Sequence, residues 1–339
     1  MKSVYDITAD EIMKEEPLKA EVGSSLSQIK NTMENNNLRA IPVVDEKNVL
    51  EGVVGYRDLI RFIQFNPETT KLSKVMHRAT EFDLNESLVD LADLRINSGR
   101  KLLVSTSNGK LRGVIGDQEF ANAMKNIEEL EKTSTREICA EDLMTVFEDD
   151  SLEDARHKML DNNISRVPVI DKDGNLTGII QSTDMLKTLV PRDSQNSGGT
   201  AGNREGTEVY IQGGTEKKKM SGVTSEEIMD RLVNTSEDHM SVPEALEKME
   251  DQECFEIVFV DDKYPETIVT LKDLIDEVSE HEQENAILVS LVGLDLPEEK
   301  AAVHKKIKNQ IQGGLGRKLK NPDELRLRIK KADKDGKKH

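Results

Sequence analysis

Four copies of one short pattern constrain the fold of this chain more than any other feature of its 339 residues. The two clearest copies run from Arg39 to Ile60 and from Arg166 to Leu186. In both, a proline stands ten positions before a glycine (42 to 52, 168 to 178) and sixteen before an aspartate (42 to 58, 168 to 184). Spacing shared over this length indicates an internal repeat, so the chain is expected to consist of copies of one supersecondary unit.

Each copy predicts a strand, a tight turn, a second strand and a helix. In the third copy, residues 166–170 are mostly apolar, residues 171–174 have turn composition, and residues 176–181 suit a second strand. Ser182, Thr183 or Asp184 then opens a helix, because hydroxyl and carboxylate side chains cap helix N-termini. The unit is therefore expected to mix helix and sheet.

Two weaker copies keep this frame. In the second, Leu103 takes the place of the proline and Glu119 that of the aspartate, again sixteen positions later. In the fourth, residues 257–261 lead to residues 267–274, which include Thr270 and Asp273. A hydrophobic residue and a methionine precede each copy, at 12–13, 75–76, 143–144 and 228–229, so the methionines are 63, 68 and 85 residues apart.

An amphipathic helix is predicted before each first strand. In the first copy Leu26, Ile29 and Met33 share one helical face, with Ser24 or Ser25 as the cap. The corresponding residues of the next two copies are Leu88, Leu91 and Leu94, and Leu152, Ala155, Met159 and Ile164. A polar helix over residues 118–132 is expected to lead out of the second copy.

The combined pattern resembles the cystathionine-β-synthase (CBS) domain, four times over residues 5–280. It carries a hydrophobic residue and Met, an amphipathic helix, Arg-x-Pro-Val-x-Asp, Gly-x-Leu-x-Gly-Ile-Ile and a final aspartate. The resemblance implies an α/β protein made of α+β CBS folds that pair into two modules. We expect repeats at 1–68, 69–134, 135–191 and 224–282, a flexible linker at 192–223, and a basic segment at 283–339. One extra strand over residues 207–214 is the alternative to a linker without structure.

CBS pairs hold an adenine nucleotide in the cleft between repeats, so the resemblance implies AMP, ADP or ATP as a ligand but no required cofactor. Such a ligand needs a carboxylate for the ribose hydroxyls, an apolar slot for the base, and cations or hydroxyls for phosphate. The resemblance assigns these roles to Asp58, Glu119, Ser182, Thr183, Asp184, Thr270, Asp273, Arg39 and Arg166.

Each of these residues also has a purely structural interpretation. A hydroxyl or carboxylate at a helix start stabilises the helix by about 1 kcal/mol without any nucleotide. Arg39, Lys101 and Arg166 lie before the first long strand, where they could equally be surface charges or salt-bridge partners. The Thr-x-x-Asp of the family survives at Thr270 and Asp273, whereas the other copies have lost the threonine. Degenerate clefts in a scaffold therefore stay an alternative.

Charge divides the chain into an acidic body and a basic end. Residues 300–339 hold fourteen Lys and Arg against four Asp and Glu, or +10, so residues 1–299 must carry −28 to give the total of −18. A basic segment attracts phosphate backbones or an acidic protein surface. Without aromatic residues between the cations, folded RNA is favoured over stacked single strands. The predicted RNA-binding residues are Lys305, Lys306, Lys308, Arg317, Lys318, Lys320, Arg326, Arg328, Lys330 and Lys331.

The C-terminal segment reads as strand, helix, strand and turn. Residues 286–294 and 324–330 have strand patterns, Pro297 opens a helix, and residues 333–336 suit a hairpin turn. We expect the sequence to end inside a domain, its missing part either truncated or supplied by a partner. The segment resembles the start of the ribosome hibernation factor domain, and the layout resembles archaeal ribosome-silencing CBS proteins. This resemblance implies the small ribosomal subunit as a partner.

Catalytic and metal-binding patterns are missing from the sequence, which argues against an enzyme. The six histidines lack metal spacing, no nucleophile has a recognisable base, and no phosphate-binding or dinucleotide glycine motif is present. Cys139 and Cys254 are expected to be free thiols. No apolar run approaches bilayer length, so we expect a cytoplasmic protein with neither membrane nor DNA as a partner.

Three hypotheses follow for function. In the first, which the charge reversal favours, a non-enzymatic regulator binds the small ribosomal subunit and keeps it inactive or dimerised, while the CBS clefts sense adenine nucleotides. In the second, a nucleotide-sensing CBS module acts on another protein without ribosome contact. In the third, the repeats are a scaffold. The sequence leaves monomer and homodimer open.

Overall fold

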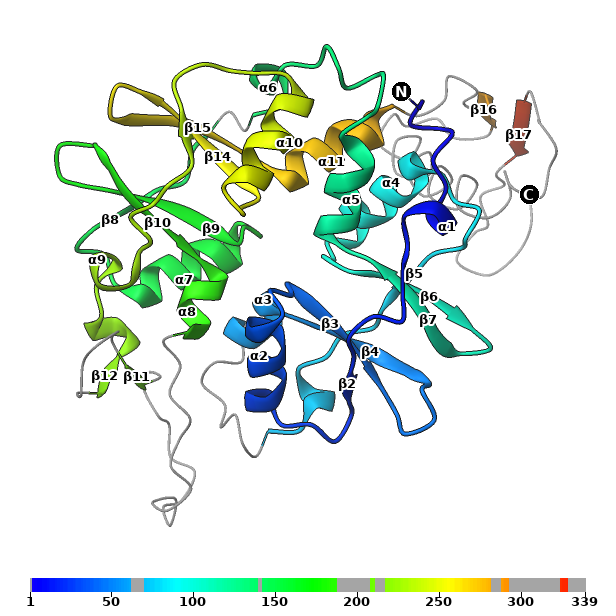
Figure 1. Ribbon diagram of the computed structural model, residues 1–339, viewed down its shortest axis with the longest axis horizontal. Coiled ribbons are helices and arrows are strands. Elements are labelled where there is room, and N and C mark those ends of the chain that lie inside the picture. The colour runs from blue at the N-terminus through cyan, green and yellow to red at the C-terminus, as the bar shows by residue number, and fades with distance from the viewer. Residues whose placement is uncertain are drawn as a thin grey trace, which may run out of the picture. The chain divides into compact units, whose positions relative to one another are not determined.

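The computed structural model (Figure 1) describes residues 2–61, 70–139, 142–187, 208–210, 217–281, 288–292 and 324–328. The chain divides into two compact units, Met1–His281 and Glu282–His339. The repeats make up the first unit and the basic end belongs to the second. Within the residues that the structure describes, no helix has the length and apolar character needed to cross a membrane.

The four repeats of the first unit share one order of elements. The first contains α1 (Ala9–Ile12), β1 (Lys14–Glu15), β2 (Ala20–Glu21), α2 (Leu26–Asn35), β3 (Ala40–Val44), β4 (Leu50–Gly55) and α3 (Tyr56–Arg61). The second contains η1 (Leu72–Lys74), β5 (Thr80–Glu81), α4 (Leu88–Ser98), β6 (Leu103–Ser107), β7 (Lys110–Ile115) and α5 (Asp117–Met124).

The third repeat contains α6 (Thr135–Ile138), β8 (Val146–Phe147), α7 (Leu152–Asp161), β9 (Arg166–Ile170), β10 (Leu176–Gln181) and α8 (Ser182–Lys187). The fourth contains η3 (Met220–Gly222), α9 (Ser225–Ile228), β13 (Thr235–Ser236), α10 (Val242–Asp251), β14 (Glu256–Asp261), β15 (Tyr264–Thr270) and α11 (Leu271–Glu280). Between them, β11 (Glu208–Tyr210) pairs antiparallel with β12 (Lys217–Lys219), so the extra strand that the sequence left as an alternative is present.

Each repeat builds a small mixed sheet. A short strand runs parallel to the first long strand, which pairs antiparallel with the second, in the orders β2-β3-β4, β5-β6-β7, β8-β9-β10 and β13-β14-β15. In the second repeat, β1 of the first repeat adds a fourth strand antiparallel to β7. The repeats therefore confirm the predicted mixed fold and its strand, turn, strand and helix order.

Serine caps start the long helix that precedes each first long strand. Ser25, Ser87, Ser151 and Ser241 each accept a hydrogen bond from the backbone N–H three residues later, where a polar side chain reaches back to complete a capping box. Ser25 is thus the cap of α2, one of the two candidates from the sequence. The predicted apolar face of α2 forms, since Leu26, Ile29 and Met33 are buried. In the next two helices Leu94 is only half-buried, and Ile164 lies beyond the end of α7, so it was wrongly placed on that helix.

Two predictions about the second repeat were wrong. The helix predicted over residues 118–132 is α5, which ends at Met124, because the following backbone hydrogen-bonds the N-terminal segment at Lys2 instead. Val104, not Leu103, is the structural equivalent of Pro42 and Pro168. Each of these three residues pairs with the residue of the second strand that stands five positions before the repeat carboxylate. The shift arises from the tight turn at Asn108 and Gly109, both with positive φ.

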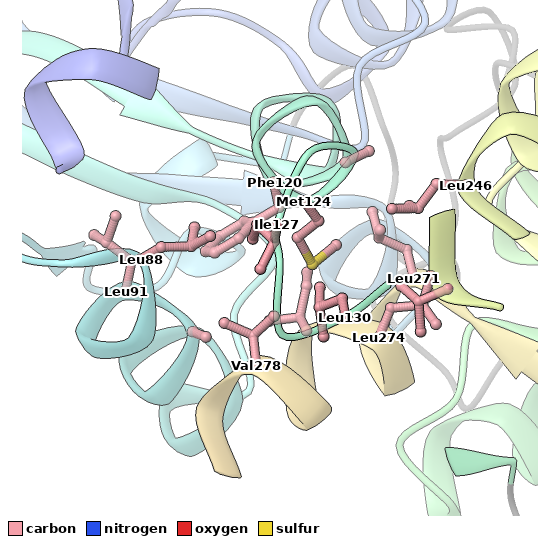
Figure 2. Packing of buried hydrophobic residues seen from close by; sticks show 14 of the residues in the cluster. Leu88, Leu91, Phe120, Met124, Ile127, Leu130, Leu246, Leu271, Leu274 and Val278 are labelled. Atoms are coloured by element: carbon pink, nitrogen blue, oxygen red, sulfur yellow. The ribbon is translucent and has the colours of Figure 1, made fainter. Parts of the chain in front are cut away.

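Buried side chains join the repeats in two directions. The sheets of the first and second repeats share one apolar cluster, and those of the third and fourth share another, which confirms pairing into two modules. Helices of the first and third repeats share a larger cluster, and helices of the second and fourth repeats share the largest. In Figure 2, Leu88 and Leu91 of α4 lie near Val278 of α11, with Phe120 and Met124 of α5 beside them.

In the second unit, β16 (Leu288–Val292) and β17 (Glu324–Arg328) form a parallel pair. Both strands lie within segments predicted as strands. Parallel neighbours need a crossover connection, as a strand, helix and strand would provide. The predicted helix after Pro297 and the turn at 333–336 lie outside the described residues.

Candidate functional site

The four repeat carboxylates occupy one structural position. A carboxylate oxygen of each accepts the backbone N–H three residues earlier, at 2.9 Å for Asp58, Glu119 and Asp184 and 2.8 Å for Asp273. This contact caps the helix that follows the second strand. The capping interpretation therefore holds at all four positions, and a ligand role needs further features around the carboxylate.

Asp273 differs from the other three in its local environment. The Oγ1 of Thr270 also donates to Asp273 Oδ2, at 2.7 Å. Burial raises the pKa of Asp273 above its ordinary value, although the hydrogen bonds from Thr270 oppose this shift. The Thr-x-x-Asp of the fourth repeat thus forms a half-buried, locally hydrogen-bonded acceptor.

A cleft of ≈ 220 Å³ lies beside Thr270 and Asp273. One part of its lining is apolar and comes from the third and fourth repeats: Met144, Ile164, Pro168, Phe255, Ile268 and Leu271. Another part is cationic and reaches across to the first and second repeats: Arg57, Arg95, Lys101, Arg166 and Lys272. An apolar slot, a carboxylate and cations therefore meet in one cavity.

Lys101 lies among several other cations of this cleft. Its Nζ donates to Ser165 Oγ at 3.0 Å. Burial lowers the pKa of Lys101 to about 7; Asp117 opposes this shift, and the cations of Arg166, Arg39 and Arg95 add to it. A phosphate group in the cleft would supply the missing negative charge.

The two arginines from the first module are already held in place. Arg57 donates to the carbonyl oxygen of Asn163 at 3.0 Å and to that of Gly99 at 3.2 Å. Arg95 pairs with Asp117 at 2.6 Å. Burial would raise the pKa of Asp117, but the cations of Arg95, Lys101 and Arg39 hold it below its usual value. These contacts fix the cationic wall of the cleft before any ligand arrives.

Arg166 and Arg39, both predicted to meet phosphate, are engaged with protein groups. Arg166, with 7% of its side chain exposed, pairs with Glu256 at 2.7 Å and donates to the Phe255 carbonyl at 2.6 Å. Arg39 donates to Gln181 Oε1 at 3.2 Å, and its guanidinium lies 5.6 Å from the Phe255 ring centroid. Arg166 still lines the large cleft, whereas Arg39 lines a smaller pocket.

That smaller pocket, of ≈ 30 Å³, lies around Asp58. Asp58 lies 3.0 Å from His77 Nδ1 and 3.9 Å from an Arg100 nitrogen, and Ser182 contributes to the wall. A volume of this size suits about one water molecule and not a nucleotide. The structure thus places Asp58 and Ser182 apart from the cleft of Thr270 and Asp273.

The remaining predicted site residues are placed as follows. Thr183 and Asp184 lie in the first turn of α8, and Glu119 lies in the first turn of α5. None of these three lines the large cleft. Arg326 and Arg328 belong to β17, where their side chains are not described, and the other predicted RNA-binding residues lie outside the described part of the chain.

Arg57 and Arg95 were missed from the sequence because they come from the other module. From the sequence, Met144 was identified only as the methionine that precedes the third copy of the pattern, and not as a site residue. Among the residues that the structure describes, no group of three or more His, Cys, Asp or Glu could hold a metal ion. Cys139 and Cys254 are free thiols, as predicted, and burial raises the pKa of Cys139 to about 11.

The comparison with known proteins agrees with this fold. The CBS domain model matches residues 9–65 and 136–191, so the chain contains CBS domains. An uncharacterised protein of Methanocaldococcus jannaschii, MJ1404, is 25% identical over 315 residues, 92% of this chain and 71% of its own.

Two solved structures share the fold. The M. jannaschii protein MJ1225 aligns over 80% of this chain and 99% of its own, with 18% identity and a TM-score of 0.64. A conserved protein of Pyrococcus horikoshii aligns over 80% of this chain and 100% of its own, with 19% identity and a TM-score of 0.52.

Proposed function

We propose that this protein is a non-enzymatic regulator that binds an adenine nucleotide in the cleft between its third and fourth repeats. The observation that carries the proposal is the meeting of a half-buried Thr270–Asp273 pair, an apolar wall and a cationic wall in one cavity. These are the three features that a nucleoside phosphate needs.

Each part of the nucleotide has a partner in this arrangement. Asp273 uses Oδ2 for the helix cap, which leaves Oδ1 to accept the ribose hydroxyls. The base fits between the apolar side chains of Met144, Pro168 and Ile268. The phosphates then point to Lys101 and its neighbouring arginines. AMP, ADP and ATP share this chemistry, and the cationic wall distinguishes them by phosphate number.

The position of the cleft favours regulation over catalysis. Its carboxylate and apolar wall belong to the second module, whereas Arg57, Arg95 and Lys101 belong to the first. A bound nucleotide would contact both modules, so its binding energy can favour one arrangement of the modules over another.

Isothermal titration calorimetry with AMP, ADP and ATP tests the proposal. We expect one nucleotide per chain, and about ten- to hundredfold weaker binding for Asp273→Asn, because a charged hydrogen-bond acceptor is lost. Asp58→Asn is the matched control and should bind as the unaltered protein does. Failure of all three nucleotides to bind, or equal losses in both variants, would contradict the proposal.

The proposal extends to the second unit as a contact with the small ribosomal subunit, which the regulator would keep inactive or dimerised. Its support is the net charge of +10 over residues 300–339, together with the parallel pairing of β16 and β17. The alternative is that the basic segment docks on an acidic surface of another protein.

Cosedimentation with small ribosomal subunits separates these two outcomes. The full chain should move with the subunits, and its association should weaken steeply with salt if phosphate contacts dominate. Substitution of Lys305, Lys306 and Lys308 by glutamine should weaken the association. If the full chain fails to cosediment at low salt, the ribosome contact is wrong, and the nucleotide-dependent regulator of another protein becomes the better account.

A further inference from the structure

In three of the four repeats, a glycine leaves room for the segment that crosses from the paired repeat: a methionine at Gly113 and Gly178, and the His77 carbonyl at Gly52. Gly52, Gly113 and Gly178 lie six positions before the repeat carboxylates. A Cβ built on Gly113 would lie 2.6 Å from Cγ of Met13, and one on Gly178 would lie 2.7 Å from Cγ of Met229. Both distances are far below ordinary contact, so these methionines occupy space that only glycine leaves free.

The residue that follows each methionine also pairs with the strand that contains the glycine, at the position just after that glycine. Lys14 pairs with Val114, His77 with Val53, and Asp230 with Ile179. The segment that follows the hydrophobic residue and Met therefore crosses to the other repeat of its module and covers the strand that leads to the carboxylate. Met13 and Met229 are each only 8% exposed as a result.

The fourth repeat departs from this pattern at one residue. Thr267 occupies the position of the glycine, six residues before Asp273. Its partner Met144 is 40% exposed and lines the large cleft. Among the described residues, Thr145 forms no β-bridge with Ile268, and its carbonyl instead accepts a hydrogen bond from Lys158 at 2.6 Å.

The start of the same segment docks normally. Ser134 bridges to Ser241, and the Thr135 N–H donates to the Met240 carbonyl at 2.8 Å. The crossing segment therefore docks on the fourth repeat at Ser134 and Thr135, whereas Thr145 does not pair with the strand beside Thr267. The side chain of Thr267 is a hydrogen-bond partner of Cys139, which holds it toward the crossing segment.

We infer that Thr267 is the residue that selects this cleft for the nucleotide, because its Cβ keeps Met144 from closing the cleft as Met13 and Met229 close theirs. The inference rests on the proposed function and deepens it. Gly113 and Gly178 each face a buried methionine, Gly52 faces the His77 backbone, and the fourth repeat carries threonine and has an open cleft. One nucleotide per chain, bound beside Asp273, is the consequence.

The first test needs no nucleotide. Methionine oxidation by hydrogen peroxide, followed by peptide mass spectrometry, reports exposure. Met144 should oxidise faster than Met13 and Met229 in the unaltered chain. Thr267→Gly should slow the oxidation of Met144 severalfold. Thr267→Ala keeps the Cβ and loses only the hydroxyl and methyl groups, so it should leave the oxidation rate of Met144 unchanged. Equal rates for Met144 in the glycine and alanine variants would overturn the inference.

The second test measures AMP, ADP and ATP affinity in the same variants. Thr267→Gly should bind at least tenfold more weakly, and Thr267→Ala should bind within about twofold of the unaltered chain. If oxidation follows the expected pattern while no nucleotide binds any form, the proposed function fails but the gating role of Thr267 stands. If the nucleotide binds the unaltered chain and the glycine variant equally well, the gating role fails alone.

A substitution in the opposite direction, from glycine to a residue with a Cβ, tests the inference even if Thr267→Gly folds poorly. Gly178→Ala places a Cβ where Met229 now lies, so Met229 should be displaced and oxidise severalfold faster. Met13, which lies against Gly113 in the other module, should be unaffected. A folded Gly178→Ala protein in which Met229 stays protected would contradict the role assigned to the Cβ.

Discussion

Lys101 of the second repeat and Ser165 of the third lie in hydrogen-bond contact, with Nζ and Oγ 3.0 Å apart. This contact joins the two modules at the wall of the large cleft, where the charged neighbours of Lys101 are Asp117, Arg166, Arg39 and Arg95. Because burial, with a smaller contribution from the three arginines, lowers the pKa of Lys101 to about 7, the lysine is near half-protonation at neutral pH.

Nucleotide affinity is therefore expected to fall as pH rises from 7 to 9. The pKa of Lys101 is lowered to about 7 in the free protein, and a bound phosphate raises it again. Binding then takes up a proton above pH 7, so affinity should decrease by up to about tenfold per pH unit. Calorimetry in buffers of different ionisation enthalpy measures this uptake directly.

Lys101→Arg is the matched control for this pH dependence, because arginine stays charged throughout the range. Its affinity should change little between pH 7 and pH 9. A steep pH dependence in this variant, or a flat profile in the unaltered chain, would show that another group titrates.

Gly113→Ala is expected to destabilise the first unit by about 1–3 kcal/mol, because the new Cβ meets Met13 and lies 2.9 Å from the Lys14 carbonyl oxygen. Gly23→Ala is the control, since a Cβ added at Gly23 would meet no atom within 4 Å. Urea unfolding followed by circular dichroism measures both free energies. Equal stability of the two variants would show that the segment at Met13 and Lys14 moves aside without any loss in the free energy of unfolding.

Glu256→Gln should cost about 3 kcal/mol in the free energy of unfolding. Glu256 and Arg166 are 4% and 7% exposed, and the substitution leaves Arg166 as a buried cation without its carboxylate. Adding Arg166→Met should recover part of the loss, since the uncompensated charge is removed. A double-mutant cycle by chemical denaturation measures the coupling, and additive losses would show that the pair is not energetically linked.

Local pattern predicted much of the first unit. Strand, turn, strand and helix recur because the residues that specify them are neighbours in sequence, as in Asp171 to Gly174, where Asp171 Oδ1 accepts the backbone N–H groups of Asp173 and Asn175. The register of the second repeat failed because Asn108 and Gly109 turn the chain more tightly than the turn of the first repeat does.

The cleft was harder to predict than the fold. Thr270 and Asp273 carry a sequence motif, but Arg57 and Arg95 approach them only through packing between the modules, which no local pattern encodes. Thr267 did leave a signal in the sequence, as the single departure from glycine at its repeat position. Its meaning depends on Met144, 123 residues earlier in the chain, and so appears only in the folded structure.

A chain ending at His281 is expected to keep both the stability and the nucleotide affinity of the first unit. Residues 1–281 form a compact unit, and the Tyr5 hydroxyl donates to the His281 carbonyl at its end. Leu274→Ala in α11 is the contrast, because this buried side chain packs in the core of the second and fourth repeats and its loss should cost about 2–5 kcal/mol. Thermal unfolding compares the three proteins. A large loss of stability in the shortened chain alone would show that the basic unit stabilises the CBS repeats, and the two units would then have to be treated as one folding unit.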